Sequence, residues 1–252
     1  MEFLVLFGSG LAIGVVSSMI GIGGGSFMVP LLVLGRFVAT AQEAVGTSIA
    51  GVLFMGLSAS LAYRRSRTGD PLLALWTAPA AILTSWGSAA FSGRVESGGI
   101  LVAFGALLAA MGIVMALGKT PKELGGAPRK ILPYPWGALA VGALAGVTAG
   151  LFGLGGGTIM VPGFTLLLGV EMHAAVATSL LVMIPSAGIA TAQHALAGNT
   201  HWEFVLPLAL GIVLGAQVGP RVAKRLPQRA LRRIFSLALF YAAFRMIAKG
   251  LG

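Results

Sequence analysis

The chain has 252 residues, of which 57% are hydrophobic and only 10% are charged. A soluble domain carries about 25% charged residues, so this composition excludes an ordinary water-soluble protein and indicates a surface that mostly faces lipid. The formal net charge of +10 comes from lysines and arginines that fall between apolar segments, as in cytoplasmic loops, which excludes nucleic acid as a partner.

Apolar segments follow one another along the chain. The N-terminal one lacks the basic start and cleavage site of a removable signal peptide, so we treat it as the first membrane segment. Most segments approach the roughly 20 residues that cross about 30 Å of hydrocarbon, whereas 26–36 and 158–169 span about half of that. We expect helices at about 3–20, 26–36, 40–63, 71–92, 99–118, 136–152, 158–169, 174–196, 203–222 and 231–249.

A repeat organises these segments. The run Gly-Ile-Gly-Gly-Gly-Ser-Phe-Met-Val-Pro at 21–30 matches Gly-Leu-Gly-Gly-Gly-Thr-Ile-Met-Val-Pro at 153–162, and Ala-Val-Gly-Thr-Ser at 44–48 matches Ala-Val-Ala-Thr-Ser at 175–179. Gene duplication is the simplest cause. The pattern predicts an N-terminal repeat over 1–118, a polar, proline-rich cytoplasmic linker over 119–135, and a C-terminal repeat over 136–252.

The positive charges indicate how the two repeats are oriented. If each short segment counts as a pass, 13 of the 17 lysines and arginines fall on one side of the membrane; if it does not, the split is 9 to 8. We therefore predict an all-α polytopic membrane protein with two inverted repeats. Each has four long transmembrane helices plus a short half-helix after a glycine-rich break, and both termini lie outside.

The glycine-rich breaks are the best candidates for a binding site. Unpaired backbone groups are costly in hydrocarbon, so each break must be buried or line a cavity. The half-helix after each break presents free N–H groups and a positive dipole end, and paired broken helices indicate a transporter site for an anion. The predicted substrate-binding residues are Gly23, Gly24, Gly25, Ser26, Thr47, Ser48, Gly155, Gly156, Gly157, Thr158, Thr178 and Ser179. The alternatives are glycines that ease helix crossing and hydroxyls that bond to the preceding turn.

Few ionisable residues lie near the breaks. Glu43 follows Thr40 with capping-box spacing, and Glu171 and His173 occupy the matching turn of the second repeat. These three are also candidates for carrying a coupling proton or interacting with a coupling cation. His194 and His201 are expected to be external-loop residues and are too sparse for a metal site. Since the chain has no cysteine, thiolate metal sites are excluded, and we expect neither a metal nor a cofactor.

The motif Gly-x-Gly-Gly-Gly-x-x-x-Val-Pro followed by Ala-Val-Gly/Ala-Thr-Ser, present twice over about 250 apolar residues, resembles the sulfite exporter TauE/SafE family of permeases. The resemblance implies that the cargo is sulfite, sulfoacetate, a related organosulfonate or another small organic anion. It also implies a location in the bacterial inner membrane.

Three functions fit an apolar helical protein. A secondary transporter is favoured because no nucleotide-binding loop occurs in the chain. An anion-conducting channel of the same architecture is the alternative. An intramembrane enzyme is not expected, because no catalytic motif or catalytic residue can be named. The exact cargo, the direction, the coupling ion and the oligomeric state stay open.

Overall fold

A computed structural model describes residues 2–64, 68–117 and 134–251. All regular secondary structure in these ranges is helical, which confirms the predicted all-α class. The helices are α1 (Glu2–Ile20), α2 (Gly25–Leu34), α3 (Ala41–Arg64), α4 (Pro71–Ser92), α5 (Ser97–Leu117), α6 (Tyr134–Phe152), α7 (Gly157–Pro162) with its π-helical continuation η2 (Gly163–Leu167), α8 (Met172–Leu196), α9 (Trp202–Ala223) and α10 (Gln228–Leu251).

Each predicted helix is present, with its ends within three residues of the expected ones. In the described ranges, α1, α3, α4, α6, α8 and α9 are long and apolar enough to cross a membrane. The chain is therefore a multi-pass membrane protein. Most of the predicted linker over 119–135 lies outside the described residues, as does part of the basic loop after α3.

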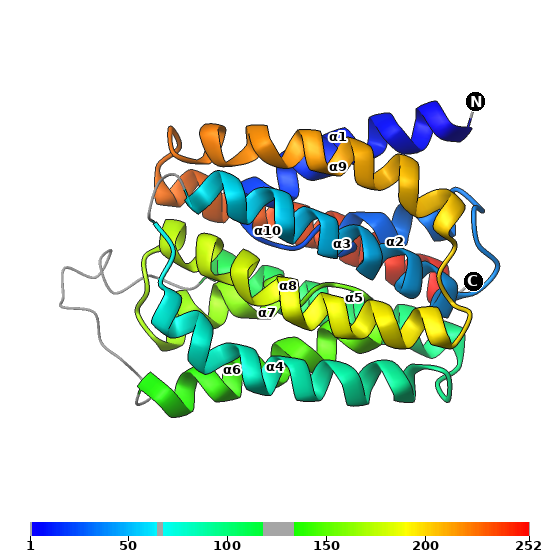
Figure 1. Cartoon of the computed structure of the whole chain (residues 1–252), viewed down its shortest axis with the longest axis horizontal. Coiled ribbons are helices and arrows are strands. Elements are labelled where there is room, and N and C mark those ends of the chain that lie inside the picture. The colour runs from blue at the N-terminus through cyan, green and yellow to red at the C-terminus, as the bar shows by residue number, and fades with distance from the viewer. Residues whose placement is uncertain (1, 65–67, 118–133, 252) are drawn as a thin grey trace.

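The long helices lie side by side along one axis, and the N- and C-termini lie at the same end of the bundle (Figure 1). Small residues allow the closest helix pairs to touch. A Cβ atom on Gly10 or Gly14 of α1 would collide with the backbone of α9, at Leu208 and Ile212 respectively. The positions advance together along both helices, so α1 and α9 run parallel, with the glycine-mediated packing typical of membrane helices.

The same packing recurs between α6 and α4. A Cβ atom on Gly142 would collide with the backbone of Thr77, and one on Gly146 with that of Ala81. These glycines lie 132 residues after Gly10 and Gly14. The pair α6–α4 is therefore the counterpart of α1–α9, and its two helices also run parallel.

The middle of the bundle is formed by α3 and α8 (Figure 1). Gly56 of α3 lies against Ile184 of α8, whereas Leu53, one turn earlier, lies near Gly188, one turn later. The numbering runs in opposite directions, so these two central helices are antiparallel. Because α3 begins just after α2 and α8 just after η2, this pair positions both short helices at the centre of the protein.

Candidate functional site

Both glycine-rich breaks have the same backbone conformation. We call residues 21–25 the first break and residues 153–157 the second break. In the first break Gly21, Gly23 and Gly24 have φ angles of 75°, 97° and 79°, in the left-handed region. The matched glycines of the second break, Gly153, Gly155 and Gly156, have φ angles of 67°, 71° and 78°. Glycine adopts this conformation at no steric cost, which explains the residue type at each position.

The two breaks cross each other in direct contact. A Cβ atom on Gly25 would overlap the carbonyl oxygen of Gly153, and one on Gly157 would overlap the carbonyl oxygen of Gly21. A Cβ atom on Gly23 would likewise overlap the carbonyl oxygen of Leu154. These contacts support the interpretation that the glycines permit a close crossing. They also leave no room for a ligand between the breaks, only beside them.

Ser26 and Thr158 meet where the halves meet. They occupy the first turns of α2 and α7, they are fully buried, and their hydroxyl oxygens lie 3.5 Å apart. The two residues are repeat counterparts, since 158 − 26 = 132. The beginnings of the two half-helices therefore converge on one point of the protein.

Ser48 and Ser179 brace the breaks. The Ser48 hydroxyl donates to the carbonyl of Val45, one turn back, at 2.9 Å, and it also lies 3.3 Å from the Gly153 carbonyl oxygen. The Ser179 hydroxyl donates to the Val176 carbonyl at 2.8 Å and lies 3.3 Å from the Gly21 carbonyl oxygen. Each serine thus bonds to its own preceding turn and also contacts the break of the other half.

Thr47 and Thr178 support the entries to two long helices. The Thr47 hydroxyl accepts a hydrogen bond from the backbone N–H of His201 at 3.1 Å, just before α9. The Thr178 hydroxyl accepts from the backbone N–H of Asp70 at 2.9 Å, just before α4. Both threonines therefore hold the opposite half in place, a role that the sequence motif alone does not reveal.

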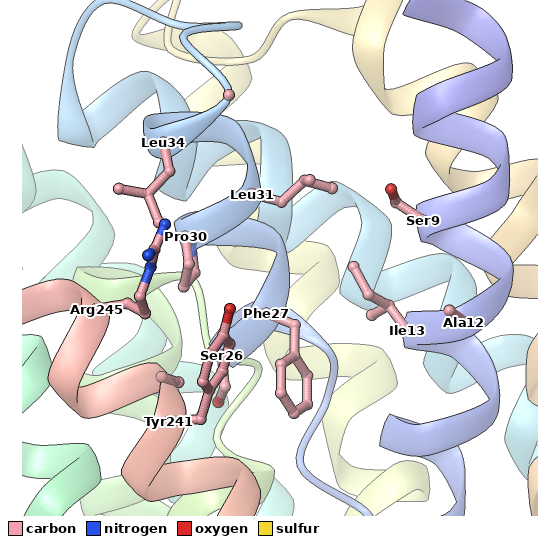
Figure 2. A pocket seen from close by; sticks show the side chains of 12 residues that line it. Ser9, Ala12, Ile13, Ser26, Phe27, Pro30, Leu31, Leu34, Tyr241 and Arg245 are labelled. Carbon is pink, nitrogen blue, oxygen red and sulfur yellow. The ribbon is translucent and has the colours of Figure 1, made fainter.

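A cavity of about 460 Å³ lies beside the first break, between α1, α2 and α10. Of the predicted binding residues, Ser26 lines it, and Figure 2 shows Ser26, Phe27 and Arg245 around it. A second cavity of about 680 Å³, mostly apolar, lies between α3, α8 and the start of α4, and none of the predicted residues lines it.

Glu43 forms the expected capping box at the start of α3. Its carboxylate accepts from the N–H groups of Ala39 at 2.9 Å and Thr40 at 3.4 Å, and its own N–H donates to the Thr40 hydroxyl at 3.2 Å. The same carboxylate lies 3.4 Å from Nε2 of His201, whose Nδ1 lies 2.9 Å from the Glu203 carboxylate. A partly exposed cluster of titratable groups therefore stands at the starts of α3 and α9.

Glu171 and His173 are not part of that cluster. Glu171 is the N-cap residue of α8, and Nε2 of His173 bonds to the carbonyl of Ala223 at 3.1 Å. Ala223 is the last residue of α9, and His201 is the residue directly before α9. The length of this helix, about 33 Å, therefore separates His173 from the cluster at Glu43 and His201. The structure does not bring the three coupling candidates together.

His194 is not a loop residue, which corrects the sequence-based expectation. It lies buried in α8, 1% exposed, and its Nε2 bonds to the carbonyl of Gly150 at 2.8 Å. Its repeat counterpart Tyr63 donates in the same way to the carbonyl of Ser18, at 3.4 Å. The offset of 131 residues between Tyr63 and His194 was the available sequence signal. His201 does lie in the loop before α9, as expected.

Comparisons with known proteins agree along the length of the chain. A family model described as "Sulfite exporter TauE/SafE" matches residues 6–246. The chain is 29% identical over 235 residues to the "Probable membrane transporter protein YunE" of Bacillus subtilis, which covers 84% of this chain and 85% of the relative. It is 37% identical over 117 residues to a "Probable membrane transporter protein" of Haemophilus influenzae, which covers 43% and 44%.

Proposed function

Because the chain belongs to the sulfite exporter TauE/SafE family of membrane transporters, we propose that it is a secondary transporter of small anions. The cargo is most simply a sulfite- or organosulfonate-type oxyanion, and the membrane is the bacterial inner membrane. We propose no catalytic residue, no cofactor and no enzymatic activity for this transport cycle.

The proposed substrate site lies beside the crossing of the breaks, at the beginnings of α2 and α7. The observation that carries it is the meeting of Ser26 and Thr158, counterparts 132 residues apart, at 3.5 Å. The first N–H groups of a helix have no partner one turn earlier and attract an anion, and the two hydroxyls can also donate to it. The left-handed glycines Gly23, Gly24, Gly155 and Gly156 turn the chain so that both helices begin here.

Within this site the glycines and the Thr-Ser pairs have supporting roles. Gly25 and Gly157 form the contact between the breaks, and Ser48 and Ser179 hold that contact from the opposite halves. Thr47 and Thr178 fix the starts of α9 and α4. These residues shape the site, and the direct contacts to the anion come from Ser26, Thr158 and the helix-end N–H groups.

We also propose two inverted repeats, each with four long transmembrane helices and a short half-helix that counts as a further pass, so that α5 and α10 join the six long helices named above as crossings. Three contacts support the inversion: α1 is parallel to α9, its counterpart α6 is parallel to α4, and the counterparts α3 and α8 are antiparallel. In Figure 1 the counterparts α4 and α9 likewise run in opposite directions. Together with the 13 to 4 charge split, these contacts favour both termini outside and the linker over 119–135 in the cytoplasm.

Since the chain has no native cysteine, single cysteines can test this orientation directly. A membrane-impermeant thiol reagent applied to intact cells is expected to label Glu2→Cys and Arg94→Cys but not Lys224→Cys. Labelling of Lys224→Cys with protection of the other two would reverse the proposed orientation.

Coupling is proposed to use the cluster at Glu43 and His201 rather than Glu171 or His173. The support is that the His201 ring lies 3.4 Å from the Glu43 carboxylate and 2.9 Å from that of Glu203, whereas His173 bonds a backbone carbonyl. Replacement of Glu43 by Gln is expected to abolish the pH dependence of anion uptake. Unchanged proton-coupled uptake in this variant would remove Glu43 from the mechanism.

Flux measurements in liposomes test the function itself. Purified protein is expected to move sulfite or a short sulfonate with a rate that saturates with concentration and depends on an imposed gradient. A flux that rises linearly with concentration would support the alternative, an anion-conducting channel of the same architecture. Absence of flux for every small anion would refute both.

A further inference from the structure

The cavity beside α2 is lined largely by apolar side chains and one arginine, none of which the proposed anion site between Ser26 and Thr158 requires. It follows the whole half-helix, from Ser26 in the first turn to Leu34 and Gly35 at the end. Its wall is mostly apolar, with Ile13, Phe27 and Leu31 among the lining side chains. Against this wall stands one charged residue of the lining, Arg245 of α10, which reaches toward Pro30 and Leu34 of α2 in Figure 2.

Arg245 carries its charge without a carboxylate nearby. Arg245 takes part in none of the ion pairs found among the described residues, such as those that join His201 to Glu43 and Glu203. An arginine stays protonated at any physiological pH. Arg245 is exposed rather than buried in the protein, but it lines the cavity, and a charged side chain that faces an aqueous cavity of a membrane protein usually marks a substrate path. The cavity therefore presents a cation that lacks a protein counter-ion.

The corresponding place beside α7 has no equivalent of this cation. The counterparts of Tyr241 and Arg245, 131 residues earlier in α5, are Ala110 and Val114. On that side Gly163 fits closely against the side chain of Val141, where a Cβ atom would lie 2.8 Å from it. The arginine is therefore not a requirement of the repeated fold, which forms the same half-helix without it.

We propose that this cavity is the entry site for an organic anion, with Arg245 as the residue that selects for the acid group. The inference rests on the proposed anion transport and specifies its cargo. The acid group pairs with the Arg245 guanidinium, and the organic body lies against Ile13, Phe27 and Leu31. Tyr241 and Ser26 offer hydroxyls within the same cavity. A volume of about 460 Å³ is in the range of sites that hold whole organic ligands, and bare sulfite would leave most of it empty.

A structural role for Arg245 makes a different prediction. A cation near the C-terminus of α2 would stabilise the helix dipole, so its loss would lower the melting temperature without changing anion binding. Lys249 provides a matched control, because it lies one turn further along α10 and is exposed as Arg245 is, but does not line the cavity. The comparison of Arg245→Gln with Lys249→Gln separates the two roles.

The test measures sulfonate binding by calorimetry on the full chain, purified in detergent, with sulfite, ethanesulfonate and propanesulfonate as probes. Arg245→Gln is expected to weaken propanesulfonate binding about 10- to 100-fold, as for loss of a charge-assisted hydrogen bond, while Lys249→Gln binds like the wild type. Arg245→Lys is expected to retain part of the affinity. Each methylene of the probe is expected to tighten binding up to about fourfold.

Two results would overturn the inference: Arg245→Gln binding propanesulfonate as Lys249→Gln does, or sulfite binding as tightly as propanesulfonate. An anionic lipid shares the chemistry of these probes, so nanodiscs with and without phosphatidylglycerol form a further arm. If sulfonate binding is lost only in the nanodiscs that contain phosphatidylglycerol, Arg245 binds a lipid headgroup and the entry site is refuted. If the wild-type protein moves anions across liposomes but Arg245→Gln binds propanesulfonate as the wild type does, this inference fails and the proposed transport stands. Absence of all flux refutes the transport itself.

Discussion

The two halves of the protein share their breaks and differ in the short helix after each break. After the first break, α2 is a regular helix of ten residues with a cavity beside it. After the second break, α7 has six residues and continues as the π-helix η2, whose Gly163 fits against Val141. The two breaks are alike because they cross, and each break packs directly against the other. The part beyond the crossing is free to diverge, and there a cavity lies beside α2 whereas η2 packs closely against α6.

A second comparison concerns the side chains that bond across helices. At matched positions Tyr63 and His194 both bond to a backbone carbonyl near the end of the first helix of a repeat, that of Ser18 in α1 or Gly150 in α6. A carbonyl accepts from any donor, so the position matters more than the residue type. The two repeats therefore share this hydrogen bond to the first helix even though the donor residue differs between them.

The largest effects are expected at the crossing, and they test whether the two breaks are equivalent. Gly25→Ala and Gly157→Ala each push a methyl group into a backbone carbonyl that cannot move aside, so each is expected to cost about 3 kcal/mol or more. Thermal unfolding monitored by size-exclusion chromatography measures this. Gly87→Ala is the control, because a Cβ atom there meets nothing within 4 Å. If Gly157→Ala behaved like Gly87→Ala, the second break would not be packed as the first is.

The next effect is expected to differ between the halves. Thr47→Val and Thr178→Val remove the acceptor of a backbone N–H, that of His201 or Asp70. The Asp70 carboxylate also caps α4 by accepting from Leu72 and Leu73, at 3.0 Å each, whereas His201 makes no side-chain cap. Thr47→Val is therefore expected to destabilise by about 2 kcal/mol and Thr178→Val by about 1 kcal/mol, as melting temperatures in one detergent would show. The reverse order would contradict the capping argument.

Smaller and equal effects are expected for the two serines. Ser48→Ala and Ser179→Ala each remove one hydroxyl that contacts the opposite break, at an expected cost of about 1 kcal/mol. Because the contacts are reciprocal parts of one crossing, the double variant is expected to lose less than the two single losses combined. Strict additivity in a double-mutant cycle on thermal stability would show that the two braces act independently.

The smallest effect is expected at Glu43, which has no counterpart capping box in the second half, where Glu171 and Ala174 occupy the matched positions. Glu43→Gln keeps an acceptor for the N–H groups of Ala39 and Thr40 but loses the charge that faces His201. A partly exposed ion pair contributes little, so the change in melting temperature is expected to correspond to less than about 1 kcal/mol. Glu43→Ala, which also removes the cap, is expected to be the more damaging of the two, and equal effects would exclude the capping box as a contributor.

Much of the fold could be predicted from local features of the sequence. The ends of α4 were predicted correctly from the apolar pattern, and in the structure Asp70 caps its start and Gly93 follows its end. The ends of α10 were predicted three residues short at the start, where arginines interrupt the apolar pattern. The exposure of His194 was predicted wrongly, since a histidine near a loop is indistinguishable in sequence from one that turns inward to bond the carbonyl of Gly150.

The candidate site was predictable only in part. The three-glycine runs and the Thr-Ser pairs were found because they occur twice. The separate roles of these residues were not predicted, because the partner of Thr47 is His201 and the partner of Gly25 is Gly153, each more than 100 residues away. The place of Arg245 in a cavity with Ser26 was not predicted, because it depends on how α10 packs against α2.

By itself, the sequence determined that this is a helical membrane protein, where its helices lie and where two of them break. Each of these follows from short-range physics: the transfer of an apolar segment into lipid and the φ angles open to glycine. Only the tertiary structure decided that the breaks cross, that Ser26 meets Thr158, and that a single arginine faces a cavity on one side. Those are distances between residues far apart in the chain, and they are set by the packing of all the helices together.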